Sequence, residues 1–198
     1  MLDAVHLRHH VSYDAHTKKM VGYVDFGMGA DSETIAKEAL VLMVVGLKGR
    51  WKAPVAYYLT AGVTAVFQQQ LGLATLAKLF EVGLTVHTIT VDGHATNVSM
   101  CKALGCQLDP SRPLQPYFSM PETGETVQVI FDACHMVKLV RNTLHKYRIL
   151  VSPQGMIQWD LLTKLHTLQD SNGLRLANKV GKNHILYGNQ KMKVSFRF

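Results

Sequence analysis

The sequence predicts an α/β fold in which helices flank a mixed five-stranded sheet. Three observations indicate this class. The first part of the chain alternates apolar with polar residues, which is typical of antiparallel strands. After it, helical and extended patterns take turns, as they do where crossover helices join parallel strands. The 198 residues, 47% of them hydrophobic, suffice for one sizeable core.

The first two strands are expected in a long β-hairpin. Residues 2–13 and 20–26 carry the alternating pattern, and the polar residues 14–19 form the turn between them. The chain begins within the first of these strands. We therefore expect further residues upstream of Met1.

Residues 32–47 are predicted to form a helix. Its second half, residues 40–45, is apolar on every side and partly β-branched. Periodicity cannot decide there between a helix and a strand, and either form would be buried. The third strand is predicted over 54–60, and an amphipathic helix follows over 71–82, ending at Gly83 because a left-handed glycine commonly stops a helix.

The fourth strand is predicted over residues 84–91, an apolar, β-branched run that stops at Asp92 and Gly93. Such a run suits a strand covered on both faces, and the glycine permits a tight exit turn. Ligands of open α/β sheets bind at the carboxyl ends of strands, so Asp92 is a candidate site residue; an isolated acid there more often caps the next helix. A helix, a proline-rich loop and the fifth strand follow over 95–104, 109–124 and 127–131.

Three strands joined by hairpin-like returns, then helix, strand, helix and strand, form the ribonuclease H-like succession. That fold carries one acid on its first strand and another at the end of its fourth, where this sequence has Asp3 and Asp92. Neighbouring carboxylates can bind a pair of Mg²⁺ ions, which prefer oxygen ligands and can activate water. Asp25 is the alternative candidate for the first acid. The alternative for Asp3 is that it is an acidic residue of a strand that only faces solvent.

A second polar array follows the fifth strand, with its members three or four residues apart on one helical face. The basic side chains of this array could contact phosphates or form a solvated face. Its acid, Asp132, could assist the acidic site or cap the helix. A net charge of +7 favours a polyanionic partner such as DNA. The array consists of Asp132, His135, Lys138, Arg141 and Asn142.

Several classes of protein are excluded or disfavoured. No apolar run reaches the roughly 20 residues of a membrane span, and the N-terminus lacks the layout of a secretory signal. The P-loop pattern of many nucleotidases is absent. Three cysteines do not make a disulfide framework and are typical of reduced thiols in an intracellular protein. An alternative is zinc binding by four residues whose spacing matches no paired zinc motif, namely Cys101, Cys106, Cys134 and His135.

In combination, these motifs resemble P-element-type transposases, in particular relatives fused to THAP zinc-finger domains. The resemblance spans essentially the whole chain, and the ordered set is far more specific than any one piece. It rests on residues 2–5, 22–25, 91–93, the D-x-x-H-x-x-K-x-x-R-N array over 132–142, and residues 173–179 and 191–194.

The resemblance implies a nuclear DDE transposase that cuts and joins DNA with Mg²⁺, carries a GTP-binding insertion domain and forms a homo-oligomer at full length. Residues 1–146 would be the N-terminal part of its ribonuclease H-like core. Residues 147–198 would begin a truncated α-helical insertion, with a helix over 159–168 that continues over 173–179. Asp3 and Asp92 would be two of the three catalytic acids, and His135, Lys138, Arg141 and Asn142 would face nucleic acid.

The third acid of that family is a glutamate beyond the insertion, and this sequence lacks it. Glu122 and Glu125 lie in the proline-rich loop, too early to replace it. Because this chemistry depends on holding both metals, we expect neither catalysis nor GTP binding from the chain alone. The alternative function is that of a non-catalytic DNA- or protein-binding remnant of a domesticated transposase.

Overall fold

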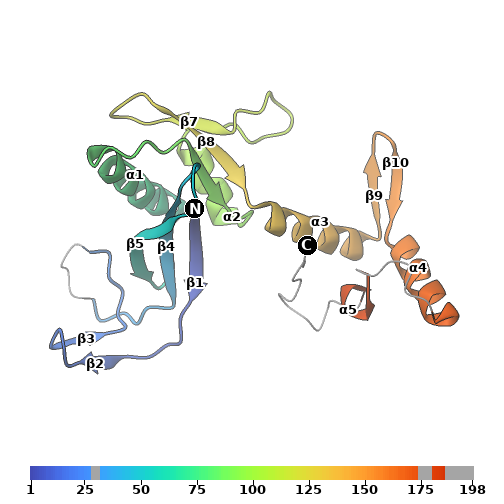
Figure 1. Ribbon diagram of the computed structural model, residues 1–198, viewed down its shortest axis with the longest axis horizontal. Coiled ribbons are helices and arrows are strands. Elements are labelled where there is room, and N and C mark those ends of the chain that lie inside the picture. The colour runs from blue at the N-terminus through green and yellow to red at the C-terminus, as the bar shows by residue number, and fades with distance from the viewer. Residues whose placement is uncertain (28–31, 174–179, 186–198) are drawn as a thin grey trace. The chain divides into compact units, whose positions relative to one another are not determined.

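The computed structural model describes residues 1–27, 32–173 and 180–185. The chain forms two compact units, Met1–Asp132 and Ala133–Phe198 (Figure 1). Each unit has its own cluster of buried apolar side chains. The two units divide before helix α3 (Ala133–Tyr147), which belongs to the second unit, whereas the division expected after residue 146 falls near the end of that helix. Among the described residues, no helix is long and apolar enough to cross a membrane.

The first unit begins with a three-stranded antiparallel sheet. Its strands lie in the order β1 (Leu2–His6), β4 (Glu38–Val45) and β5 (Lys52–Thr60). Leu2 lies opposite Leu42 across the β1–β4 ladder, and both side chains are buried in the core. The strand predicted over residues 54–60 is confirmed as β5.

The helix predicted over residues 32–47 does not form, and the strand that was the alternative for residues 40–45 is confirmed as part of the central strand β4. The backbone of β4 pairs with β1 on one side and with β5 on the other. This pairing on both edges, with β-branched residues in the strand, decides what periodicity left open. The residues before β4 are extended too, since Ile35 bridges to Tyr23.

The predicted long hairpin is divided: residues 2–6 of its first strand form β1 of the main sheet, and a shorter hairpin lies outside that sheet. Strands β2 (Ser12–Asp14) and β3 (Lys19–Val21) pair in a two-stranded sheet of their own. The predicted strand over 20–26 breaks at Gly22, whose φ of +112° is left-handed, and a Cβ there would clash with the carbonyl of His10. Beyond the break, Asp25 touches the main sheet through a single bridge to Leu59 of β5.

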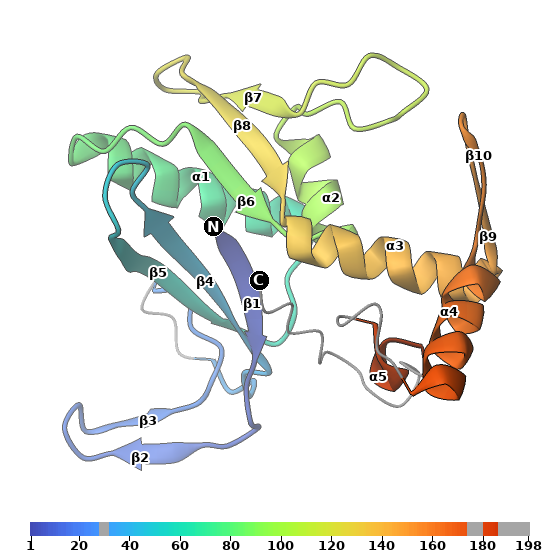
Figure 2. The same cartoon turned by 45° about the vertical axis from the view of Figure 1, so that its right-hand side comes forward.

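A second three-stranded sheet follows in the order β6 (Thr88–Val91), β8 (Thr126–Phe131) and β7 (Tyr117–Ser119). Strand β6 runs parallel to β8, whereas β7 runs antiparallel to it. Strands β1 and β6 contact one another, so the two sheets meet through these strands (Figure 2). The mixed α/β architecture predicted from the sequence is therefore confirmed.

Two details of the second sheet differ from the prediction. Strand β6 begins at Thr88, and of the residues before it the carbonyl of His87 still accepts a hydrogen bond from Gln128 of β8 at 2.9 Å. Strand β7 lies inside the predicted loop over residues 109–124, where the prolines obscure a short alternation that buries Phe118.

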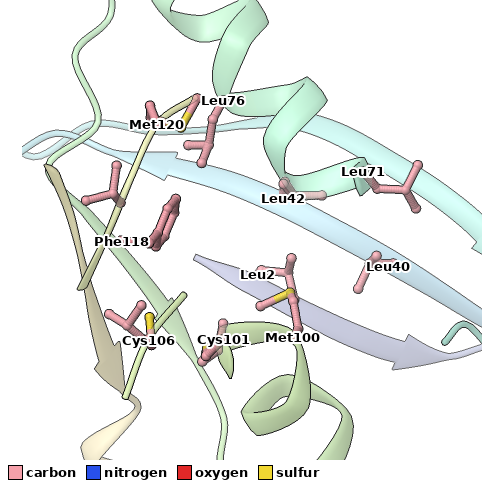
Figure 3. Close-up of a cluster of buried hydrophobic side chains, with 13 residues drawn as sticks. Leu2, Leu40, Leu42, Leu71, Leu76, Met100, Cys101, Cys106, Phe118 and Met120 are labelled. Carbon is pink, nitrogen blue, oxygen red and sulfur yellow. The ribbon is translucent and has the colours of Figure 1, made fainter. Parts of the chain in front are cut away.

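Helices α1 (Ala65–Glu81) and α2 (Ala95–Ala103) contact each other and complete the core of the first unit (Figure 3). Helix α1 begins at Ala65 rather than at residue 71, because the hydroxyl oxygen of Thr64 accepts a hydrogen bond from the Phe67 N–H and caps it. The predicted helix over 95–104 is confirmed as α2. The core is formed by Leu2, Leu40, Leu42, Leu71, Leu76, Val91, Met100, Cys101, Cys106, Phe118, Met120, Val127 and Val129.

The second unit contains α3, the hairpin β9 (Ile149–Ser152) and β10 (Gly155–Gln158), α4 (Trp159–Asn172) and the short α5 (Lys182–Ile185). The hairpin corrects the expectation of an α-helical segment. The helix predicted over 159–168 is confirmed as α4. It ends at left-handed Gly173, where the predicted continuation was to begin, and residues 174–179 lie outside the described part.

The assignment of β4 as a strand predicts unequal effects of two substitutions three residues apart. Leu42 is 8% exposed, whereas Val45 is 55% exposed, because positions an odd number apart face opposite sides of a strand. Leu42→Ala should lower the free energy of unfolding by about 2–5 kcal/mol in urea titrations followed by circular dichroism. Val45→Ala should cost less than about 1 kcal/mol. Similar costs at both positions would instead fit a helix, in which residues i and i+3 share a face.

Candidate active site

Two strand ends bring Asp92 and Asp132 to the same edge of the second sheet. Strands β6 and β8 are parallel, and Val91 lies opposite Phe131. The backbone N–H of Asp132 donates to the carbonyl oxygen of Val91 at 2.8 Å. The two acids therefore follow neighbouring strand ends, and both are half-buried.

Asp3 lies on β1, the strand that contacts β6. It directly follows Leu2 in the core, just as Asp92 directly follows the core residue Val91. Alternation along the strand turns the half-buried Asp3 away from the face that buries Leu2. The Asp3 Oδ1 atom accepts a hydrogen bond from the N–H of Ala4 at 2.9 Å.

Asp25, the alternative first acid, lies on the far side of the first sheet. Its backbone exchanges two hydrogen bonds of 2.9 Å with Leu59 of β5. Strands β5 and β4 therefore separate it from β1, a distance of roughly 14 Å at the usual strand spacing. Its carboxylate accepts the N–H of Gly27 at 2.7 Å. This arrangement favours Asp3 as the neighbour of β6.

The carboxylate of Asp92 is held at one oxygen by the start of α2. Oδ1 accepts the backbone N–H of His94 at 2.9 Å and the side-chain Nδ2 of Asn97 at 2.6 Å. Asn97 in turn accepts a hydrogen bond of 2.5 Å from Nε2 of Gln68 on α1. Within the described part of the chain, no donor binds the other oxygen of Asp92, Oδ2.

Sequence reasoning did not assign a role to Asn97 or Gln68. Asn97 lies five residues after Asp92, in the first turn of the predicted helix, so a polar residue there was a usable signal. Gln68 is 29 positions from Asn97 and sits in an ordinary amphipathic helix. Only the packing of α1 against α2 brings it to the site.

The acids fit part of a divalent-cation site. Their carboxylate oxygens are the ligands that Mg²⁺ prefers, and Asp92 keeps Oδ2 for a further contact. Among residues 1–27, 32–173 and 180–185, no three His, Cys, Asp or Glu side chains are grouped to hold a metal ion. Asp3 and Asp92 would therefore need at least one more ligand.

The structure gives no support to a zinc site at the cysteines. Cys101 and Cys106 are buried, whereas Cys134 is exposed at the start of α3. Burial raises the pKa of the Cys101 thiol to about 12, with a smaller contribution from neighbouring Cys106. Burial also raises the pKa of Cys106. Zinc binds thiolates, so neutral thiols in an apolar core are poor ligands.

The basic array lies on α3, in the second unit. Its members His135, Lys138, Arg141 and Asn142 are all half-buried. Large apolar side chains of the same stretch are exposed, with Val140 58% exposed. Arg141 donates from Nε and Nη2 to Oδ1 of Asn142, at 3.2 and 2.9 Å. The helix therefore does not present its cations as a fully solvated face.

A cavity of about 600 Å³ lies in the first unit. Aliphatic residues of β4, α1 and the segment before β6 line it, together with Trp51, and no Asp or Glu is among its lining residues. It therefore contributes no acid to the arrangement around Asp92.

The chain is similar to known proteins along most of its length. Residues 1–105 match the TNP-like RNase H N-terminal domain, and residues 134–197 match the TNP-like GTP-binding insertion domain. The DNA transposase THAP9 of Homo sapiens is 29% identical over 194 residues, which are 94% of this chain and 22% of that protein.

A solved structure, the Drosophila P element transposase strand transfer complex, has a TM-score of 0.71 to this chain at 22% identity. The similarity covers 93% of this chain and 37% of that one. At this identity the likeness establishes a shared fold. The chain thus spans well under half the length of either relative.

Proposed function

Because the chain belongs to the family of P-element-type transposases, we propose that its first unit supplies Asp3 and Asp92 to a site that cuts and joins DNA. The observation that carries the proposal is the position of Asp92. It follows the end of β6, the strand in contact with β1, and one of its oxygens is fixed while the other faces no donor of the described residues. Ligands of open α/β sheets bind at such strand ends.

The residues of this chain would act by holding charge in place. When bound, a pair of Mg²⁺ ions would activate the attacking oxygen and stabilise the leaving oxygen of a phosphodiester. Asp92 would offer Oδ2 to a cation while His94 and Asn97 hold Oδ1. Asp3 would contribute a second carboxylate from β1. Partial burial of both acids lowers the local dielectric and strengthens their attraction for a cation.

Two acids make an incomplete site, so we propose that the chain alone does not cleave DNA. The described residues hold no third side chain grouped with the pair to bind a metal ion. A third ligand would come from outside the described residues. Asp132 follows the neighbouring strand and would add negative charge at this edge.

The second unit would contact the polyanionic partners of such a protein. Helix α3 places Lys138 and Arg141 three residues apart, at the spacing of one helical face. We assign them to DNA phosphates. GTP is proposed as a ligand of the insertion domain in the full-length protein, because residues 134–197 match a GTP-binding insertion domain. A protein that acts on chromosomal DNA would work in the nucleus, and homo-oligomer formation stays a proposal for the full-length protein.

The acidic site predicts selective loss of cation binding. Mn²⁺ can replace Mg²⁺ at oxygen sites and is followed by electron paramagnetic resonance. Asp92→Asn and Asp3→Asn should each weaken Mn²⁺ binding at least about tenfold, since each removes a charged ligand. Asp25→Asn serves as the matched control and should leave binding unchanged, because Asp25 lies beyond β5.

Loss of Mn²⁺ binding in Asp25→Asn but not in Asp3→Asn would make Asp25 the first acid. Unchanged binding in all three variants would contradict the metal site and favour a non-catalytic binding protein. Cleavage of DNA by the unmodified chain with Mg²⁺ would contradict the requirement for a third ligand.

The basic array predicts weak, sequence-independent binding of duplex DNA that salt abolishes. Replacing both Lys138 and Arg141 by alanine should weaken all duplexes about equally. It should also reduce the slope of log affinity against log salt by about 2. Fluorescence anisotropy with two unrelated duplexes at several salt concentrations measures both effects.

The control for the basic array is Lys48→Ala with Arg50→Ala, which removes the same charge from the exposed turn between β4 and β5. This variant should keep nearly the original salt slope. Equal losses in the two double variants would show that net charge, rather than α3, binds DNA.

A further inference from the structure

A chain of buried amide groups leads from α1 to the carboxylate of Asp92. Gln68 is 3% exposed and Asn97 is 8% exposed, so both amides are nearly withdrawn from water. The Gln68 Nε2 atom donates to Asn97 Oδ1 at 2.5 Å, and Asn97 Nδ2 donates to Asp92 Oδ1 at 2.6 Å. The two bonds connect helices α1 and α2 to the end of strand β6.

The direction of both hydrogen bonds follows from the charge of the acid. An ionised carboxylate only accepts hydrogen bonds, so Asn97 must turn its NH₂ group toward Asp92. Its amide oxygen then faces Gln68, which must donate from Nε2. Rotating the Asn97 amide by half a turn would set an oxygen against the carboxylate and an NH₂ group against the Gln68 donor. The two amides therefore fit one orientation of the Asp92 carboxylate.

We propose that Gln68 and Asn97 are positioning residues for Asp92, which fix Oδ1 so that Oδ2 is presented to a divalent cation. This inference rests on the proposed function. Neither amide would touch the cation or the DNA. Asn97 would act on Asp92 directly, and Gln68 would act through Asn97 by holding its amide in the donating orientation. Hydrogen-bonding partners of this kind typically change metal affinity 10–100-fold when they are removed.

A purely structural role in joining the two helices is the competing explanation, and the chain offers a matched control for it. Gln69 lies next to Gln68 on α1 and donates from Nε2 to the backbone oxygen of Ala103, at 2.9 Å. It therefore also connects α1 to α2, but it has no contact with Asp92. Replacing Gln69 removes a bond between the helices and leaves the amide chain intact.

The experiment compares Mn²⁺ affinity and thermal unfolding in Asn97→Ala, Gln68→Met, Gln69→Met and Asp92→Ala. Methionine preserves the length of glutamine without its donor. Asn97→Ala should weaken Mn²⁺ binding about tenfold or more, and Gln68→Met should weaken it in the same direction by less. Gln69→Met should keep the original affinity even where it lowers the melting temperature as much as Gln68→Met does.

The variants distinguish a failure of this inference from a failure of the proposed function. If Asp92→Ala binds Mn²⁺ as well as the unmodified chain, or the unmodified chain binds none, the metal site is absent and the inference falls with it. If Asp92→Ala loses binding while Asn97→Ala and Gln68→Met retain full affinity, the metal site stands and the positioning role is refuted. Equal weakening in Gln68→Met and Gln69→Met would also refute it, because helix packing would then explain both. Should Asn97→Ala fail to fold, Asn97→Ser provides a smaller change at the same position, with the same expected direction.

Discussion

The contact between β1 and β6 is the constraint on which the candidate site depends. Strand β1 pairs with β4 and also contacts β6, so it joins the antiparallel sheet to the sheet that contains parallel strands. Leu2 and Val91, from these two strands, belong to one buried cluster. Burying a side chain of this size typically contributes about 1.5–3 kcal/mol, so the contact is stabilised by the core rather than by the acids. Packing of Leu2 and Val91 in the core therefore fixes the backbone positions of Asp3 and Asp92, which follow them directly.

Packing of the helices extends this constraint to the side-chain atoms of Asp92. Helix α2 begins at Ala95, three residues after the acid. Its N-cap residue His94 supplies a backbone N–H and Asn97 supplies its amide, while α1 supplies Gln68. Burying an amide group costs free energy unless the group is hydrogen-bonded. Here Gln68 donates to Asn97 and Asn97 donates to Asp92, so each group determines the orientation of the next. Helices α1 and α2, which contribute Leu71 and Met100 to the core and contact each other, therefore also order the polar groups beside the acid.

Much of this arrangement could be predicted from the sequence, and the failures have physical causes. Asp92 was recognisable because an apolar, β-branched run ends at an acid and a glycine, which marks a buried strand with a tight exit. Strand β4 was left ambiguous because Leu40 and its neighbours are apolar on all sides, and only pairing with β1 and β5 decides the form of such a segment. Gly22 was quoted in a motif, yet its left-handed conformation and the close approach of the His10 carbonyl, which leaves no room for a Cβ, appear only in the folded chain. Gln68 could not be found from local patterns, because its partner Asn97 lies on another helix.

The central proposal is that Asp3 and Asp92 share a divalent cation. A crystal structure of the chain grown with Mn²⁺, with an anomalous difference map, tests it most directly. We expect a peak roughly 2 Å from a carboxylate oxygen of Asp3 and from Oδ2 of Asp92, with Asn97 still hydrogen-bonded to Oδ1. Carboxylates that point to opposite faces or lie more than about 10 Å apart, or a peak at Asp25 instead, would contradict it, since one ion or a pair about 4 Å apart could not join them.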